Sequence, residues 1–170
     1  MQGYYDDIAQ ICLNGHIVNG AFQLRSQDNK EFCPACGEKT ITKCPQCKDS
    51  IQGSRFKHRS HFEQGWGEEE DYIINPCRLP SYCYKCGKPF PWTEGKIQTA
   101  IQIFAEFGGL DGEEKKTIED DIRNISRDVP QGELSAMRIR KIWGKYGKIA
   151  YNVIMEFASK TAAEILKHPE

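Results

Sequence analysis

The sequence predicts a small α+β protein in two parts, a metal-stabilised N-terminal region of tandem ribbons with short β-hairpins and a C-terminal region of about three helices. All 8 cysteines of the 170-residue chain precede residue 90. Six of them form Cys-x-x-Cys pairs, which are typical of metal ligands in a small domain. Beyond residue 92 apolar residues recur mostly at helical spacing. We therefore expect one domain over residues 1–92 and a helical domain over 93–170.

The charge balance, the hydropathy and the start of the chain argue against several classes of protein. The chain carries 23 lysines and arginines against 24 acidic residues, so it lacks the bulk positive charge of non-specific phosphate binders. No window approaches the roughly 20 consecutive apolar residues that a bilayer span requires. The first seven residues include Asp6 and Asp7 and no lysine or arginine, whereas a secretory leader begins with positive charge. We expect a cytoplasmic protein that keeps its thiols reduced and does not bind membranes.

The spacing of the three cysteine pairs has a physical reason. A gap of two residues lets the backbone turn under a metal ion, so that two thiolates reach it at about 2.3 Å while nearby amides point at the sulfurs. Gly37 and Gly87 follow two of the pairs, where a left-handed backbone is often needed. Lys48 takes the matching place after the middle pair and departs from this pattern. The pairs are Cys33 and Cys36, Cys44 and Cys47, and Cys83 and Cys86.

A tetrahedral site needs four ligands, so three pairs require a fourth. The segment Cys12-Leu13-Asn14-Gly15-His16 supplies it, because Asn-Gly is a turn dipeptide and an imidazole reaches further than a thiol. A surface turn histidine is the alternative interpretation of His16. Sequential pairing predicts two coordinatively closed sites. Site one contains Cys12, His16, Cys33 and Cys36, and site two contains Cys44, Cys47, Cys83 and Cys86.

Spacing alone leaves the pairing order open between a tandem and a cross-braced arrangement. We favour the tandem because residues 38–43 alternate and include β-branched side chains, which predicts a short linking strand. Cys77 is left over and is expected to be a small buried hydrophobe. His58 and His61 lie among basic residues that would oppose a cation, so we interpret them as solvated loop residues.

The chain resembles the double zinc-ribbon proteins of bacteria, in which a Cys-x-x-Gly-His knuckle precedes Phe-Cys-x-x-Cys-Gly and then Cys-Pro-x-Cys. Residues 12–37 and 44–47 match that pattern. Residues 4–6, 9–16 and 82–94 are similar to a bacterial family of unknown function with this ribbon pair and a helical tail. The resemblance implies two structural Zn²⁺ ions, and the family carries no assigned activity.

An insertion of about residues 48–82 separates the two halves of site two. Long loops in compact domains are often functional. The insertion carries Phe56, Phe62, Trp66 and Tyr72. The sequence leaves two interpretations open: a hairpin that packs its aromatic rings on the ribbons, or a surface for contacts with other molecules.

Three helices are expected after the ribbons. The first begins at Thr93, an N-cap followed by an acidic residue, and ends before Gly108. The second covers residues 111–129, and Pro130 breaks it. The last is a long helix over about 133–167, in which Gly144 and Gly147 each cost up to about 1 kcal/mol and favour a kink or a break.

Closed metal sites and the missing catalytic motifs predict a protein that is not an enzyme. The sequence has no Gly-rich phosphate loop, Ser-His-Asp order or His-Glu-x-x-His motif. We expect an adaptor or regulatory protein that contacts protein partners or its own copies through the insertion and the helical tail. The alternative is nucleic-acid binding by a basic face near Trp143 and Tyr146, and an enzyme that uses zinc or Cys77 is least favoured. The basic face consists of Arg138, Arg140, Lys141, Lys145 and Lys148.

Overall fold

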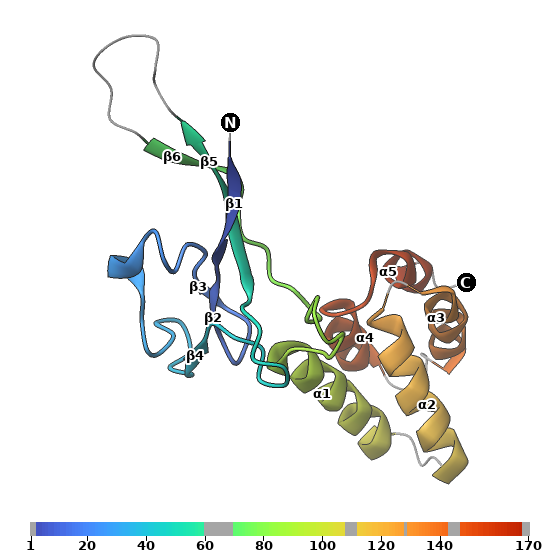
Figure 1. The fold of residues 1–170 in the computed structure, drawn as a ribbon. Coiled ribbons are helices and arrows are strands. Elements are labelled where there is room, and N and C mark those ends of the chain that lie inside the picture. The colour runs from blue at the N-terminus through green and yellow to red at the C-terminus, as the bar shows by residue number, and fades with distance from the viewer. Residues whose placement is uncertain (1–2, 60–69, 108–111, 128, 143–146, 168–170) are drawn as a thin grey trace, which may run out of the picture. The chain divides into compact units, whose positions relative to one another are not determined.

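A computed structural model describes residues 3–59, 70–107, 112–127, 129–142 and 147–167. The chain forms two compact units, Met1–Trp92 and Thr93–Glu170. The first unit contains β1 (Tyr4–Ile8), β2 (Gln10–Cys12), β3 (Ile17–Asn19), the 3-10 turn η1 (Ser26–Asp28), β4 (Thr40–Ile41), β5 (Gln52–Arg59) and β6 (Glu70–Asn75). The helices are α1 (Pro91–Phe107), which begins at the end of the first unit, α2 (Gly112–Ile125), α3 (Pro130–Ile142), α4 (Gly147–Met155) and α5 (Lys160–Lys167). The predicted α+β class is confirmed (Figure 1).

The first unit is built from two small antiparallel sheets. One has the order β3-β2-β4, and its central strand β2 is fully buried. Ile11 of β2 pairs with Ile17 on one side and with Ile41 on the other. Ile11 also belongs to the buried core of this unit. The other members of this core lie in the segments that connect or follow the strands, and two of them are cysteines. The core consists of Ala9, Ile11, Cys44, Ile51, Cys83, Phe90 and Trp92.

The second sheet is formed by the N-terminus and the insertion. Figure 1 shows β1, β5 and β6 side by side, in that order. Tyr5 pairs with Phe56, which pairs in turn with Ile73. Phe56 is buried and its ring stacks on Tyr5 with centroids 5.6 Å apart, whereas Tyr72 is exposed. The insertion therefore forms a hairpin of β5 and β6, as in the first of the two interpretations, and this hairpin pairs with β1 in a three-stranded sheet. Phe62 and Trp66 lie outside the described residues.

The interpretation of His58 as a loop residue is wrong. His58 lies in β5, and its Nδ1 is 2.9 Å from Oδ1 of Asp71 on β6. The reason is the alternation of Arg55-Phe56-Lys57-His58-Arg59, which has the period of two that a strand requires. His61 lies outside the described residues.

Buried polar side chains hold the segment 20–30, which makes no sheet. The Asp7 carboxylate accepts hydrogen bonds from the amides of Gln23 at 3.0 Å and Leu24 at 2.9 Å. The side-chain amide of Gln10 donates a hydrogen bond to the backbone carbonyl of Lys30 and accepts one from the backbone amide of Lys30. These hydrogen bonds pair backbone amides and carbonyls that would otherwise be buried without a partner. The irregular segment can therefore pack on the sheets, and it leads the chain to Cys33.

In the second unit, the core combines one apolar stripe from each helix. Between α2 and α3 the core also holds a buried polar contact, in which Ser135 Oγ donates to Asp121 Oδ1 at 2.6 Å. Asn124 Nδ2 donates to Ser135 Oγ at 3.4 Å. The apolar members are Ile97, Ala100, Phe104, Ile118, Ile122, Ile125, Ala136, Ile139, Ile154, Ala162 and Leu166.

The predicted long helix over 133–167 is wrong, and the described residues form five helices in place of about three. The chain leaves the helix after Met155, and the amide of Ser159 donates to the carbonyl of Ile125 at 2.8 Å. Ser159 Oγ then accepts the amide of Ala162 at 3.3 Å, the pattern of an N-cap, which starts α5. Gly144 lies outside the described residues.

Two helices begin earlier than predicted, each at a proline that the sequence analysis had placed before the helix. The first helix begins at Pro91 and not at Thr93, and the third begins at Pro130 and not at residue 133. Proline is favoured in the first helical turn because its missing N–H is not needed there and its φ is already helical. The second helix ends at Ile125, earlier than the predicted residue 129. None of the described helices is long and apolar enough to cross a bilayer.

Removing the Ser135 hydroxyl should destabilise the helical unit. Ser135→Ala leaves the buried Asp121 carboxylate without its 2.6 Å donor, which we expect to lower the free energy of unfolding by about 1–3 kcal/mol. Thr117→Ala is the control, because this hydroxyl is exposed and donates only to the carbonyl of Glu113. It should change the free energy by less than about 0.5 kcal/mol. Denaturant unfolding followed by helical circular dichroism measures both, and equal effects would contradict the assignment.

The ion pair between α1 and α2 should appear in the titration of Glu94. Burial acts to raise the pKa of Glu94, but hydrogen bonds from Arg123 at 3.2 Å and Gln98 at 2.8 Å outweigh it and lower the pKa. A lowered folded-state pKa means that the pair stabilises the fold above the unfolded pKa of about 4.3 and loses this effect as the pH falls through the folded value. Arg123→Met should therefore raise the Glu94 pKa, measured by carboxyl NMR titration. An unchanged titration would show that Arg123 does not act on Glu94.

Candidate metal centres

The three Cys-x-x-Cys pairs adopt the same backbone turn. In each, the amide of the first cysteine donates to the carbonyl five residues ahead, and the residue after the second cysteine donates back to the carbonyl of the first. The first bond measures 2.8 Å from Cys33 to Glu38, 2.8 Å from Cys44 to Asp49 and 2.9 Å from Cys83 to Lys88. The three segments therefore present their thiols in the same way.

The residue after each pair has a left-handed backbone. Its φ is 72° at Gly37, 68° at Gly87 and 63° at Lys48. Lys48 therefore departs from the pattern in residue type and not in conformation. Its ammonium donates to the carbonyl of Pro45 at 2.7 Å, inside the same turn. Among the described residues, Lys48 is the only one other than glycine with a positive φ.

The Cys12–His16 segment forms a related but longer turn. The amide of Cys12 donates to the carbonyl of His16 at 3.0 Å, and the amide of His16 donates to Cys12 Sγ at 3.2 Å. Gly15 has a φ of 89°, and a Cβ atom there would lie 2.9 Å from Cβ of Trp92. This position therefore requires glycine both for its conformation and for the close approach of the Trp92 side chain.

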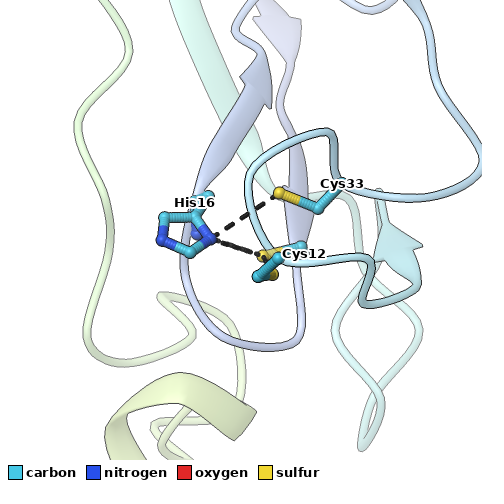
Figure 2. A group of neighbouring side chains, drawn as sticks. Cys12, His16 and Cys33 are labelled. Atoms are coloured by element: carbon cyan, nitrogen blue, oxygen red, sulfur yellow. Dashed lines mark hydrogen bonds between the residues drawn. The ribbon is translucent and has the colours of Figure 1, made fainter.

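Site one brings together the four side chains that the sequence paired first. Figure 2 shows His16 turned toward Cys12 and Cys33. Its Nδ1 lies 3.4 Å from Cys12 Sγ and 3.6 Å from Cys33 Sγ. Cys12 Sγ is 3.8 Å from Cys36 Sγ. Nδ1 is therefore the imidazole atom that faces the thiols.

Site two brings together the other four cysteines. Cys44 Sγ lies 3.9 Å from Cys86 Sγ, and Cys47 Sγ lies 3.6 Å from Cys83 Sγ. In each site the four ligand atoms all lie within 4.8 Å of one another. All eight cysteines are free of disulfide bonds. The grouping is sequential, as in the tandem arrangement and not the cross-braced one.

These separations match the edges of a metal-centred tetrahedron. Metal–sulfur bonds of about 2.3 Å and metal–nitrogen bonds of 2.0–2.1 Å give edges of about 3.8 Å between sulfurs and about 3.5 Å between sulfur and nitrogen. The sulfur pairs are 3.6–3.9 Å apart, and Nδ1 lies 3.4 and 3.6 Å from its sulfur neighbours. A disulfide would need about 2.05 Å. Each group can therefore hold one metal ion.

Backbone amides around the sites act to lower the pKa of the ligand thiols, but this effect wins at only some of them. Burial raises the pKa of Cys12, and burial and the neighbouring thiols raise the pKa of Cys47 to about 12. The amide of Glu38 points at Cys36 Sγ and lowers the pKa of Cys36 to about 6, helped by the side-chain amide of Asn14 at 3.5 Å. Burial tends to raise the pKa of Cys44, but the amides of Cys47 and Gln46 and the neighbouring thiols outweigh it and lower the value to about 7. Thiolates are the form that binds a metal ion.

Cys77 belongs to neither group. It is partly buried beside the core of the first unit, and its amide donates to Ser54 Oγ at 3.0 Å. Burial raises the pKa of its thiol, which favours the uncharged form. These properties are those of a small packing residue.

The predicted basic face is only partly described, and two of its cations have partners inside the helical unit. Arg138 lies 3.4 Å from the Asp121 carboxylate, and an Arg140 nitrogen donates to the carbonyl of Ile165 at 3.4 Å. Lys141 is exposed. Lys145 lies outside the described residues, as does the side chain of Lys148 in α4.

A polar cluster across the second sheet was missed by the sequence reasoning. The Tyr5 hydroxyl donates to Asp71 Oδ2 at 2.7 Å, and His58 Nδ1 lies 2.9 Å from the other oxygen. Burial and the Asp71 carboxylate raise the pKa of Tyr5 to about 12, so the phenol stays protonated and acts as a donor. No spacing signal connects residues 66 positions apart, because strand pairing alone brings them together.

Replacing Lys48 by glycine should stabilise the ribbon. A left-handed backbone costs an L-residue about 1 kcal/mol, which glycine avoids. The lost contact of Lys48 with the Pro45 carbonyl is exposed and offsets only part of this gain. We expect Lys48→Gly to raise the free energy of unfolding by about 0.5–1 kcal/mol. Lys43→Gly, in a segment without positive φ, should lower it; a destabilising Lys48→Gly would contradict the argument.

Comparison with known proteins gives one family. No curated protein and no solved structure matches the chain. One family model, described as an uncharacterized protein conserved in bacteria (DUF2321), matches residues 4–168. This span includes the strands, both groups of candidate ligands and all five described helices. With its two four-ligand groups and its helical region, the chain belongs to this bacterial family.

Proposed function

We propose that each group binds one structural Zn²⁺ ion and that the protein is a non-catalytic adaptor or regulator that works through protein contacts. The observation that supports the zinc sites is the match between the ligand separations of 3.4–3.9 Å and the edges of a zinc tetrahedron. Thiolates with an imidazole, or four thiolates, in tetrahedral geometry favour zinc among the common divalent ions.

A structural role is favoured because both sites are closed. A catalytic zinc ion keeps one position for water or substrate, whereas four protein ligands for one ion leave none. Cys44 and Cys83 of site two are buried in the core of the first unit together with Phe90 and Trp92. Metal binding and the packing of this small core are therefore coupled, so zinc supplies folding energy rather than a reaction step.

Protein contacts are favoured by the apolar side chains that the described surface exposes. Tyr4, Tyr72 and Ile74 of the second sheet are exposed by 58%, 42% and 42%, and Ile73 beside them by 39%. Tyr4 and Tyr72 lie in one row across the sheet, on either side of Lys57, and exposed apolar side chains on one face are typical of interaction surfaces. The thiolates also make the ribbons anionic, and Arg138 and Arg140 already have partners within the helical unit. Both observations favour a protein partner over nucleic acid.

Zinc counting tests the sites. Native mass spectrometry should find two zinc ions in the whole chain. Cys36→Ser and Cys86→Ser should each lose one ion or yield insoluble protein, because a site with three ligands loses much of its binding energy. Cys77→Ser is the matched control and should keep both ions. A wild-type chain with fewer than two ions, or a Cys77→Ser variant that loses one, would refute the ligand assignment.

Binding experiments test the adaptor role against the alternative. The zinc-loaded chain should cross-link to a protein partner or to itself, and single- or double-stranded nucleic-acid probes should not shift even at low salt. Salt-dependent binding to such a probe would favour nucleic acid instead, because phosphate contacts release counterions. If neither a partner nor a self-complex appears, the adaptor role fails.

A further inference from the structure

Backbone hydrogen bonds join the two halves of site one independently of the ligand atoms. Cys12 lies in the pairing of β2 with β4, and the amide of Leu13 donates to the carbonyl of Lys39 at 3.0 Å. Lys39 also pairs with Phe32, which directly precedes the turn that begins at Cys33. The sheet therefore holds the two halves of site one side by side, so the four ligand side chains are brought together by the backbone that carries them.

The two halves of site two lack such a connection. Each half closes on itself through a backbone bridge that spans its Cys-x-x-Cys turn. No strand pairing joins residues 43–50 to residues 81–90, two segments that the structure describes in full. The halves meet through their ligands, through the small apolar core, and through a side-chain hydrogen bond between the exposed Tyr84 and Asp49. An ion in site two would therefore be a main attachment of the second half.

The ligands of site one are also easier to reach from solvent. His16 and Cys36 are both exposed, and each comes from a different half of the site. In site two only Cys47 is exposed, whereas Cys44 and Cys83 belong to the apolar core of the first unit. No ligand of site one is a member of that core. A competing ligand can therefore approach an ion in site one from both halves, and that ion can leave without opening the core.

We propose that site one is an exchangeable Zn²⁺ site, which binds and releases its ion while the first unit stays folded, and that site two keeps its ion for as long as the unit is folded. The inference rests on the proposed zinc binding and adds a regulatory signal to it, the concentration of free Zn²⁺. Losing the ion of site one lowers the stability of the unit, because an ion that binds only the folded chain stabilises it by mass action. The sheet that carries the ligands remains.

Asn14 is a positioning residue for the ion in site one. Its Nδ2 donates to Cys36 Sγ at 3.5 Å, so Asn14 orients an exposed ligand without being a ligand itself. Losing a hydrogen bond of this kind commonly costs about 10–100-fold in metal affinity. Asn14 therefore gives a way to change the hold of site one on its ion while all eight ligands stay in place.

Zinc release from the full, zinc-loaded chain tests the proposal. An excess of the coloured chelator 4-(2-pyridylazo)resorcinol should remove the two ions in two phases of one ion each. The second phase should be slower by at least roughly tenfold, because it requires the core to open. Hydrogen exchange should find the amides of β2 and β4 still protected after the first phase and unprotected after the second. Adding Zn²⁺ after the first phase should restore a count of two.

Two cysteine variants assign the phases to the sites. Cys36→Ser and Cys47→Ser are a matched pair, because each replaces the exposed second cysteine of a Cys-x-x-Cys turn. Cys36→Ser should hold one ion, release it in the slow phase only, and keep β2 and β4 protected. Cys47→Ser should lose this protection.

Asn14→Ala tests site one with its ligands intact. The variant should still bind two ions but release the first roughly tenfold faster, because Cys36 has lost its hydrogen-bond donor. The slow phase is the internal control and should not change.

Several results would overturn the exchangeable site and leave the proposed zinc binding in place. A wild-type chain that releases both ions in one phase, together with its amide protection, would do so. The same holds if the two cysteine variants behave alike, or if Asn14→Ala leaves the fast phase unchanged or alters both phases equally. A wild-type chain with fewer than two ions would instead refute the zinc binding on which the proposal rests.

Discussion

The structure of the first unit depends on the convergence of four ligand atoms at two points. Cys12 and Cys36 are 24 residues apart and Cys44 and Cys86 are 42 apart, yet their sulfurs lie 3.8 and 3.9 Å from each other. The apolar core of this unit is small, and two of its members are themselves cysteines. A core of this size buries too little apolar surface to order so many irregular residues unaided. We propose that one metal ion in each group of ligands supplies the stabilisation that packing alone does not.

Site two also determines what the insertion can become. The Cys44–Cys47 pair and the Cys83–Cys86 pair meet in this site, so the two ends of the segment between Cys47 and Cys83 lie close together. With its ends close together, the segment can form the β5–β6 hairpin and align it with β1. The same alignment leaves β6 at the border of the sheet.

The second unit follows different rules. It contains no cysteine, and its helices are held by apolar stripes together with a buried contact between Ser135 and Asp121. Polar groups in such a core are costly unless paired, which makes this contact a condition for packing α2 on α3. The chain therefore combines a unit with two candidate metal centres and a unit whose folding rests on ordinary helix packing.

The sequence by itself determined the features that are local. Two-residue gaps between cysteines specify a turn of a few residues, so the knuckles, the special position of Lys48 and the eight candidate ligands could all be read from spacing. The resemblance to a bacterial zinc-ribbon family was confirmed by a family model that covers residues 4–168. The start of α1 at Pro91 was also within reach, since proline is favoured in a first helical turn.

Only the tertiary structure decided the features that depend on distant partners. The helix predicted through residue 167 ends at Met155, and the amide of Ser159 bonds to the carbonyl of Ile125 on another helix. The Tyr5–Asp71–His58 cluster exists because strands from opposite ends of the unit lie in one sheet. Periodicity and spacing describe a residue's near neighbours, whereas hydrogen bonds between remote segments form only once the whole chain has packed.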